Sequence, residues 1–190
     1  SKPNIFSNCD KIGGSLIIEN SQINLGNIKL SNLSSPNISL RQLFGGLNII
    51  NSYLKGNEIY IENSQSEDAI NFIDSNINLK SLKFNNINSD ALDSDFSKVN
   101  IENIECKKIG NDCVDLSYSS GNITSVIGNN VKDKVISLGE RSILNIFEVR
   151  AEQSAIGLVS KDLSKLNIEN FYHKKVKLPL AAYVKKPELG

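Results

Sequence analysis

The feature of this sequence that most constrains its fold is a repeat of about 22 residues. Three segments begin with aspartate at this spacing: Asp68-Ala-Ile-Asn-Phe72, Asp90-Ala-Leu-Asp-Ser94 and Asp112-Cys-Val-Asp-Leu116. Two further columns keep the same register at steps of 22 or 23 residues: Ser52, Ser75, Ser97, Ser119, Ser142 and Ser164, and Asn78, Asn100, Asn122, Asn145 and Asn167. A fixed period of this length is typical of solenoids, in which each repeat packs against the next.

Within each repeat, apolar residues alternate with polar ones, which is the period of a β-strand. Ile70 and Phe72 flank Asn71, and Val114 and Leu116 flank Asp115. Asn, Ser, Gly or Asp separate these short apolar runs. We therefore expect about three short strands per repeat, each paired in parallel and in register with its equivalents roughly 4.8 Å above and below.

The pattern predicts an all-β fold, a right-handed, single-stranded parallel β-helix solenoid of seven to eight coils with about 22 residues per coil. Leucine-rich repeats need a helical segment, hexapeptide helices need a period of six, and propeller blades are about twice as long. The first inward residues of the coils are expected to be Leu16, Leu47, Ile70, Leu92, Val114, Ile136, Leu158 and Leu180. We expect one domain over residues 1–190, with an outward loop at about 34–41. Because neither end carries a capping helix, we also expect a segment of a longer chain.

Charge and composition exclude several classes of function. The chain has 21 Lys and Arg and 21 Asp and Glu, so its net charge is zero and it lacks the basic surface of a general nucleic-acid binder. No apolar run is long enough to span a membrane. His173 is the single histidine, which is poor evidence for zinc. Cys106 and Cys113 are expected to be small buried hydrophobes, and a bridge between them stays open.

The acidic columns go beyond what a scaffold needs. One column holds Asp68, Asp90 and Asp112, the next holds Asn71, Asp93 and Asp115, and Asp95 lies two residues further along its coil. Carboxylates one strand apart repel each other, so hydrogen bonds, a cation or a metal should offset their charge. Lys134, Arg141 and Lys161 place cations beside them. Three interpretations stay open: structural aspartates in turns and solvated sheet positions, a Ca²⁺ site, and a catalytic acid/base site.

The repeat architecture, over nearly the whole chain, resembles the right-handed β-helix superfamily of pectate lyases and related polysaccharide enzymes. Calcium-dependent lyases of that superfamily hold Ca²⁺ on an aspartate cluster and use Arg or Lys as the proton-abstracting base. The resemblance implies a calcium site at Asp90, Asp93, Asp112 and Asp115, with Lys134 or Arg141 as catalytic base. The chain has no short diagnostic lyase motif and almost none of the insertions that build a substrate cleft, which counts against an enzyme.

A closer similarity is to β-helix regions of uncharacterised bacterial secreted or surface proteins, some attached to spore-coat-H-like kinase domains. It rests on Asn111-Asp-Cys-Val-Asp-Leu-Ser117, Asp133-Lys-Val-Ile-Ser-Leu-Gly-Glu140, Ser160-Lys-Asp162 and Ala181-Ala-Tyr-Val-Lys-Lys-Pro-Glu188. It implies that one face is lined by Asp112, Asp115, Asp133, Lys134, Ser137, Glu140, Lys161 and Asp162. The expected binding face is Asp68, Asp90, Asp93, Asp95, Asp112, Asp115, Asp133, Lys134, Glu140, Lys161 and Asp162.

These observations favour a non-catalytic or uncharacterised β-helix module of an exported bacterial protein, presenting a flat polar sheet to a polysaccharide or another surface protein. Rigid, regularly spaced polar columns suit a repetitive polymer. Two alternatives stay open: a calcium-dependent lyase or epimerase acting on uronic-acid polymers, and a structural stalk or spacer. The fold class places the protein outside the cytoplasm, secreted or at the cell surface.

Overall fold

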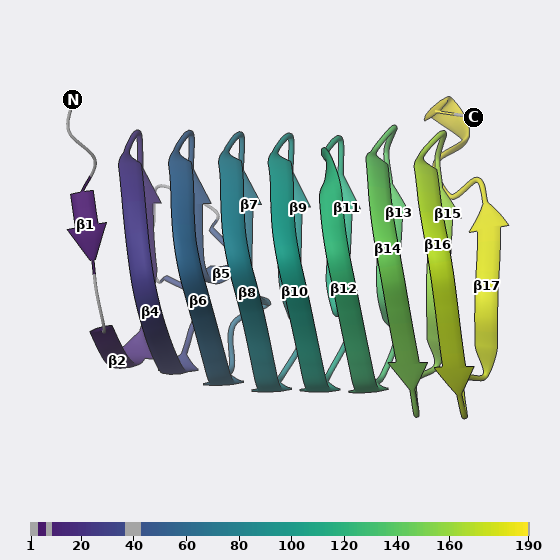
Figure 1. The fold of residues 1–190 in the computed structure, drawn as a ribbon, viewed down its shortest axis with the longest axis horizontal. Coiled ribbons are helices and arrows are strands. Elements are labelled where there is room, and N and C mark those ends of the chain that lie inside the picture. The colour runs from purple at the N-terminus through teal and green to yellow at the C-terminus, as the bar shows by residue number, and fades with distance from the viewer. Residues whose placement is uncertain (1–3, 7–8, 37–42, 190) are drawn as a thin grey trace.

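The computed structural model describes residues 4–6, 9–36 and 43–189, and these form two parallel β-sheets (Figure 1). The long-strand sheet contains β1 (Asn4–Phe6), β2 (Cys9–Gly14), β4 (Gln22–Leu33), β6 (Tyr53–Ser64), β8 (Asn76–Ile87), β10 (Lys98–Ile109), β12 (Ser120–Val131), β14 (Ile143–Glu152) and β16 (Lys165–Lys174). The short-strand sheet contains β3 (Leu16–Glu19), β5 (Gly45–Ile50), β7 (Asp68–Ile73), β9 (Asp90–Asp95), β11 (Val114–Ser117), β13 (Lys134–Gly139), β15 (Ile156–Lys161) and β17 (Leu178–Tyr183). A 3₁₀ turn, η1 (Pro187–Leu189), follows.

Each coil consists of one long strand followed by one short strand, and the chain completes about seven coils of roughly 22 residues. In Figure 1 the long strands run down the front and the short strands run up behind them as the chain advances from left to right, so the helix is right-handed. Every strand pairs in parallel with its equivalent in the next coil, as between β8 and β10. The predicted parallel β-helix is therefore confirmed.

The number of strands per coil differs from the prediction, because two of the three expected segments form one bent strand. In β10 the bend lies at Glu102, which falls between the paired residues Ile101 and Asn103 in both neighbouring registers. The inward residues on either side of the bend, Ile101 and Ile104, are three positions apart instead of two, and both are buried. The strand thus changes direction without breaking its ladder.

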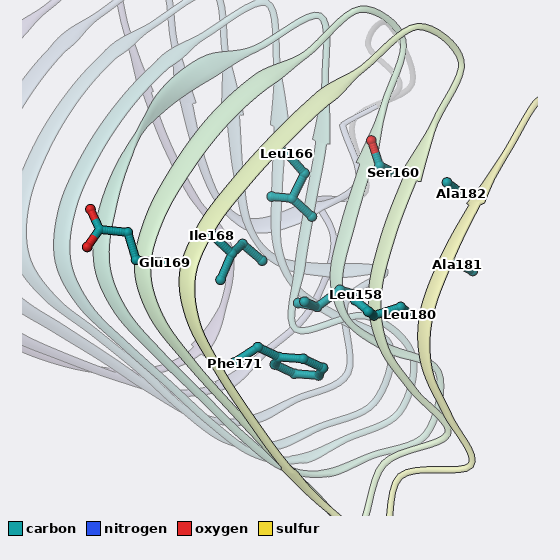
Figure 2. Close-up of a pocket in the computed structure, with 9 residues that line it drawn as sticks. All are labelled: Leu158, Ser160, Leu166, Ile168, Glu169, Phe171, Leu180, Ala181 and Ala182. Carbon is teal, nitrogen blue, oxygen red and sulfur yellow. The ribbon is translucent and has the colours of Figure 1, made fainter.

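The interior is a set of aliphatic columns that run along the axis of the coil. All eight predicted first inward residues lie in one such column, from Leu16 paired with Leu47 to Leu158 paired with Leu180. Ile70, Leu92 and Val114 in this column are fully buried. At the C-terminal end of the described coils, a hollow of about 480 Å³ opens among the inward side chains (Figure 2). Leu166, Phe171 and Leu180 line it, so it is the uncovered end of the hydrophobic core.

The serine column is a buried hydrogen-bond ladder at the corner between the two sheets. The backbone N–H of Ser75 donates to Oγ of Ser97 at 2.9 Å, and that hydroxyl donates to the carbonyl of Asp95 at 2.8 Å. The same backbone-to-hydroxyl bond joins Ser97 to Ser119 and Ser119 to Ser142. Serine repeats here because one hydroxyl satisfies two backbone groups that the corner would leave unpaired.

The asparagine column is also a ladder, but it lies on the outside of the long-strand sheet. Nδ2 of Asn122 donates to Oδ1 of Asn100 at 3.0 Å, and Nδ2 of Asn145 donates to Oδ1 of Asn122 at 3.0 Å. The left-handed backbone that favours asparagine occurs at other positions, the corners that include Asn51 and Asn86. The asparagine column of the sequence therefore forms this ladder, and the asparagines at the left-handed corners are a separate set.

The first repeat, from Leu16 to Leu47, is longer than the later ones and contains the expected outward loop. Ser34 to Pro36 follow β4, and residues 37–41 of the expected outward loop lie outside the described residues.

Cys106 and Cys113 form a disulfide with 5.9 Å between their Cα atoms, which settles the pairing that the sequence left open. It ties the end of β10 to the start of β11 inside the core. Among the described residues, no helix has the length and apolar character needed to cross a bilayer.

A candidate binding face on the short-strand sheet

Six aspartates gather on the outward side of β7, β9 and β11, and we call them the acidic face: Asp68, Asp90, Asp93, Asp95, Asp112 and Asp115. Parallel register places Asp68 beside Asp90 and Asp93 beside Asp115 on neighbouring coils. Inward residues such as Leu92 and Ser94 separate the outward positions along each strand. The proposition that residues 22 apart become neighbours therefore holds for this cluster.

The first acidic column mostly accepts hydrogen bonds from the backbone of the next coil. Oδ1 of Asp90 accepts from the backbone N–H of Asp112 at 2.7 Å, and Oδ1 of Asp112 accepts from the backbone N–H of Lys134 at 2.9 Å. These bonds continue the sheet ladder where β11 has not yet begun. Part of this column therefore has the structural role that aspartate has in turns.

The second column changes from amides to carboxylates along the coil axis. Its members are Asn48, Asn71, Asp93, Asp115 and Ser137, in register from β5 to β13. Nδ2 of Asn71 donates to Oδ2 of Asp68 at 3.1 Å and to Oδ2 of Asp93 at 3.3 Å. Within the described part of the chain, Oδ1 of Asn71 and Oδ1 of Asp115 are buried without a hydrogen-bond partner. Two oxygens of this column thus lack the hydrogen-bond partner that buried polar atoms usually have.

Crowding and burial shift the protonation of the acidic face. Burial, followed by repulsion from Asp95, Asp68 and Asp115, raises the pKa of Asp93 to about 9. Burial raises the pKa of Asp68 to about 7, even though Asn71 donates a hydrogen bond to it. Burial also raises the pKa of Asp112 to about 6. The raised pKa of Asp93 favours a protonated carboxyl group at neutral pH, and such a group donates as well as accepts hydrogen bonds.

Lysines from later coils lie at one end of the acidic columns. Nζ of Lys134 lies 3.2 Å from Oδ2 of Asp112 and also pairs with Asp133. Burial alone would lower the pKa of Lys134, but the bonds to Asp133 and Asp112 outweigh it and raise that pKa. The role of Lys134 as a catalytic base stays a prediction.

Lys161 reaches back across Gly139 to the second column. Its ammonium is buried, donates to Oγ of Ser137 at 2.9 Å and lies 4.0 Å from Oδ1 of Asp115. A methyl group at Gly139 would lie 2.9 Å from Cε of Lys161, so the absence of a side chain there opens the path. Charge along the face thus runs from acidic at β7 and β9 to basic at β15.

The remaining predicted face residues lie at the corner after β13 and β15. Glu140 accepts a hydrogen bond from Ser117 and forms an ion pair with Lys186. Oδ1 of Asp162 accepts from the backbone N–H groups of Lys185 and Lys186, so these two acids hold the C-terminal segment in place. Arg141 is exposed at the corner, and its backbone N–H donates to the carbonyl of Asp162.

The structure gives no ligand geometry for the predicted calcium site. Across residues 4–6, 9–36 and 43–189, no three His, Cys, Asp or Glu side chains are arranged to hold a metal ion. Asp90 and Asp112 already bond the backbone, and Asp93 accepts from Asn71. Calcium at Asp90, Asp93, Asp112 and Asp115 therefore stays a prediction, tested by whether Ca²⁺ raises the melting temperature.

Sequence reasoning missed an aromatic pair beside the acidic face. Phe96 directly follows Asp95, Tyr118 directly follows Ser117, and their rings stack with centroids 5.0 Å apart and planes 6° apart. The signal was present in the repeat, because Asn51, Asp74, Phe96 and Tyr118 succeed one another at steps of 23, 22 and 22 residues. Aligning the corners, and not only the strands, would have shown two aromatic rings in a column of asparagine and aspartate.

No protein-family model, curated protein or solved structure matches this chain. The structure thus supports the coarser part of the expected resemblance, a parallel β-helix. The pectate-lyase-like and spore-coat-linked parts stay predictions.

Proposed function

We propose that this chain is a non-catalytic, glycan-binding β-helix module of an exported protein, and that the glycan binds on the acidic face. The observation that carries the proposal is the register of the face, which sets Asp93 of β9 beside Asp115 of β11 and Asn71 of β7. The same kinds of polar group therefore recur at one coil spacing, roughly 4.8 Å. A polymer of repeating hydroxyl-rich units matches such a rigid, repeating surface.

The chemistry of the face fits hydroxyl groups. Ionised carboxylates are strong acceptors for O–H donors, and protonated ones donate as well. Asp90, Asp93, Asp95 and Asp115 are partly exposed on this face, so a hydroxyl group can approach their side chains. The hydroxyl dipoles of a glycan would also weaken the electrostatic repulsion among Asp68, Asp93 and Asp95.

The sign of the charge selects among glycans. Six aspartates lie on the acidic face, those that are ionised carry negative charge, and Lys134 and Lys161, which reach the face, already pair with Asp112 and Asp115. A polyuronate would bring further carboxylates against this surface and be repelled. The proposal therefore specifies a neutral polysaccharide.

Export is part of the proposal, and the disulfide supports it. Cys106 and Cys113 are both buried and bonded to each other. Structural disulfides persist in oxidising compartments and are rare in reducing ones. Intact-mass measurement of the protein from its native host, with and without reduction before alkylation, tests whether the bond exists there.

Affinity electrophoresis through gels that contain neutral polysaccharides such as β-glucan or xylan tests the binding. We expect the wild type to be retarded, and Asp93→Asn with Asp115→Asn to be retarded less. Glu102→Gln with Glu105→Gln is the matched control, because it removes two exposed carboxylates from β10 on the other sheet. Migration unaffected by every neutral polysaccharide would contradict the proposal, and unsaturated products from polygalacturonate with Ca²⁺ would favour the lyase.

A further inference from the structure

The corner that follows β3, β5, β7, β9 and β11 is built on one residue with a left-handed backbone, whereas the corners after β13 and β15 have two such residues in succession. Asn20, Asn51 and Asp74 occupy this corner in three coils, with φ between 44° and 51°. Asparagine and aspartate tolerate this conformation, whereas bulky side chains rarely adopt it. Phe96 and Tyr118 occupy the same corner in the next two coils, with φ of 52° and 50°. These two positions hold rings where the backbone favours a small polar side chain.

Burial in the core does not explain the two rings. Phe96 is 60% exposed and Tyr118 is 43% exposed, although their rings stack on each other. Because Tyr118 covers one face of Phe96 from the following coil, the other face of Phe96 lies toward the preceding coil, where the corner residue is Asp74. An exposed aromatic face above a shorter polar side chain forms a step in the surface. Strained residues that contribute little to packing occur preferentially where a ligand binds.

This step belongs to a shallow groove of about 410 Å³ that runs across four coils. The corner residues Asn51, Asp74, Phe96 and Tyr118 form one side. The first residues of β6, β8, β10 and β12 form the other side, and they lie in register: Tyr53, Asn76, Lys98 and Ser120. Three coil steps make the groove roughly 14 Å long. It therefore accommodates an extended ligand that lies along the axis.

The lining of the groove identifies the chemistry of that ligand. The exposed aromatic rings of Phe96, Tyr118 and Tyr53 offer apolar faces to the C–H side of a sugar ring. Asn51, Asn76 and Ser120 offer neutral hydrogen-bonding groups. The carboxylate of Asp74 and the ammonium of Lys98 cancel in charge, so the groove favours a neutral ligand over a charged one.

We propose that this corner groove is a sugar-binding subsite in which the free face of Phe96 stacks on a pyranose ring of a neutral glycan. Asn51 and Asp74 hydrogen-bond the hydroxyl groups of that ring, and Tyr118 supports Phe96 from behind. The inference rests on the proposed function in taking the ligand to be a glycan. It adds a site outside the predicted face, and it joins that face directly, because Asp95 and Ser117 immediately precede the two rings.

The backbone supplies a variant that removes the rings without harming the fold. Phe96→Asn with Tyr118→Asn places at both corners the residue that Asn20 and Asn51 already show to fit. We expect a melting temperature equal to or above that of the wild type. Lys108→Asn controls for the backbone change, because Lys108 has φ of 56° near the end of β10. Phe147→Ala controls for the loss of an exposed ring, because Phe147 lies on β14 and is 52% exposed.

The experiment measures dissociation constants for soluble β-glucan and xylo-oligosaccharides by calorimetry, with galacturonate oligomers for comparison. We expect the wild type to bind a neutral oligosaccharide, and the double variant to bind it about tenfold or more weakly, since an aromatic face is lost from the contact. Both controls should bind as the wild type does.

If the double variant retains wild-type affinity, the corner subsite is wrong while the proposed function stands. If the wild type binds no neutral oligosaccharide, both are wrong. If galacturonate oligomers bind more tightly than neutral ones, the charge argument for the groove is overturned.

Discussion

Asp93→Asn should stabilise this protein most at neutral and alkaline pH, and progressively less as the pH falls into mild acid. Asp93 lies between Asn71 and Asp115 in the second column, and Asp68, Asp90 and Asp95 also face it. An asparagine here would continue the amides of Asn48 and Asn71 and still accept a hydrogen bond from the Nδ2 group of Asn71. The substitution therefore removes an ionisable group while keeping the shape of the column.

The magnitude follows from linkage between protonation and folding. Burial and neighbouring carboxylates raise the pKa of Asp93 from 3.8 to about 9 in the folded state. Stability from a raised pKa is fully present below the unfolded value and is lost as pH rises through the folded value. At pH 7 the loss amounts to at most about 4 kcal/mol for this one group, and relaxation and water access reduce it toward about 1 kcal/mol. Asp68 and Asp112, whose pKa values burial raises to about 7 and about 6, act in the same direction.

Thermal unfolding followed by circular dichroism between pH 5 and pH 8.5 tests this, in a window above the titration of the carboxylates whose pKa is lowered. The wild-type melting temperature should fall across the window, and Asp93→Asn should melt higher at pH 8.5 by about 2–4 °C per kcal/mol. Glu102→Gln on the long-strand sheet should follow the wild type. An Asp93→Asn variant that is less stable at pH 8.5, or whose difference from wild type is the same at every pH, would refute the reasoning.

Three further variants test the scaffold, each by urea denaturation against the wild type. Ser97→Ala should lower the free energy of unfolding by about 1–3 kcal/mol, because the backbone N–H of Ser75 loses its buried acceptor. An unchanged urea midpoint would show that the serine ladder does not stabilise the fold. Cys106→Ala with Cys113→Ala should cost about 2.5 kcal/mol by the loop-entropy model, and a variant as stable as the oxidised wild type would contradict it. Gly139→Ala should lower the free energy of unfolding by about 1 kcal/mol, because the new methyl group displaces Lys161 from Ser137. In a Lys161→Ala background the same substitution should have no such effect.

Sequence reasoning predicted the fold well because a solenoid turns sequence period into spatial neighbourhood. The inward column from Leu16 to Leu180 is found from spacing alone, since each member pairs with the residue one coil away. The stacking of Asp93 on Asp115 follows from the same rule. The sequence period alone therefore predicts contacts between equivalent residues of neighbouring coils.

The parts that were missed depend on contacts within a coil or on side-chain reach. The bend at Glu102 merges two strands, and only the three-residue step from Ile101 to Ile104 hints at it. The disulfide depends on how the chain turns from β10 into β11. Lys161 reaches Ser137 across Gly139, a path set by a rotamer and by an absent side chain. Such features carry no period, so spacing does not reveal them.

The chain departs from its own repeat at two columns that belong to the proposed binding sites. In the second column the neutral residues Asn48, Asn71 and Ser137 show that the position folds without a carboxylate, yet Asp93 and Asp115 carry one. In the corner column Asn20, Asn51 and Asp74 show that a small polar residue suits the backbone, yet Phe96 and Tyr118 follow.

Both departures are unfavourable for folding, one by burying charge and the other by placing rings in a left-handed backbone. Both also fall on the coils of β9 and β11, three residues apart along each strand. Two independent defects of packing would have no reason to coincide in this way. A single ligand that contacts the adjacent carboxylates and rings on those two coils would explain why they coincide. Natural proteins retain destabilising residues where function requires them.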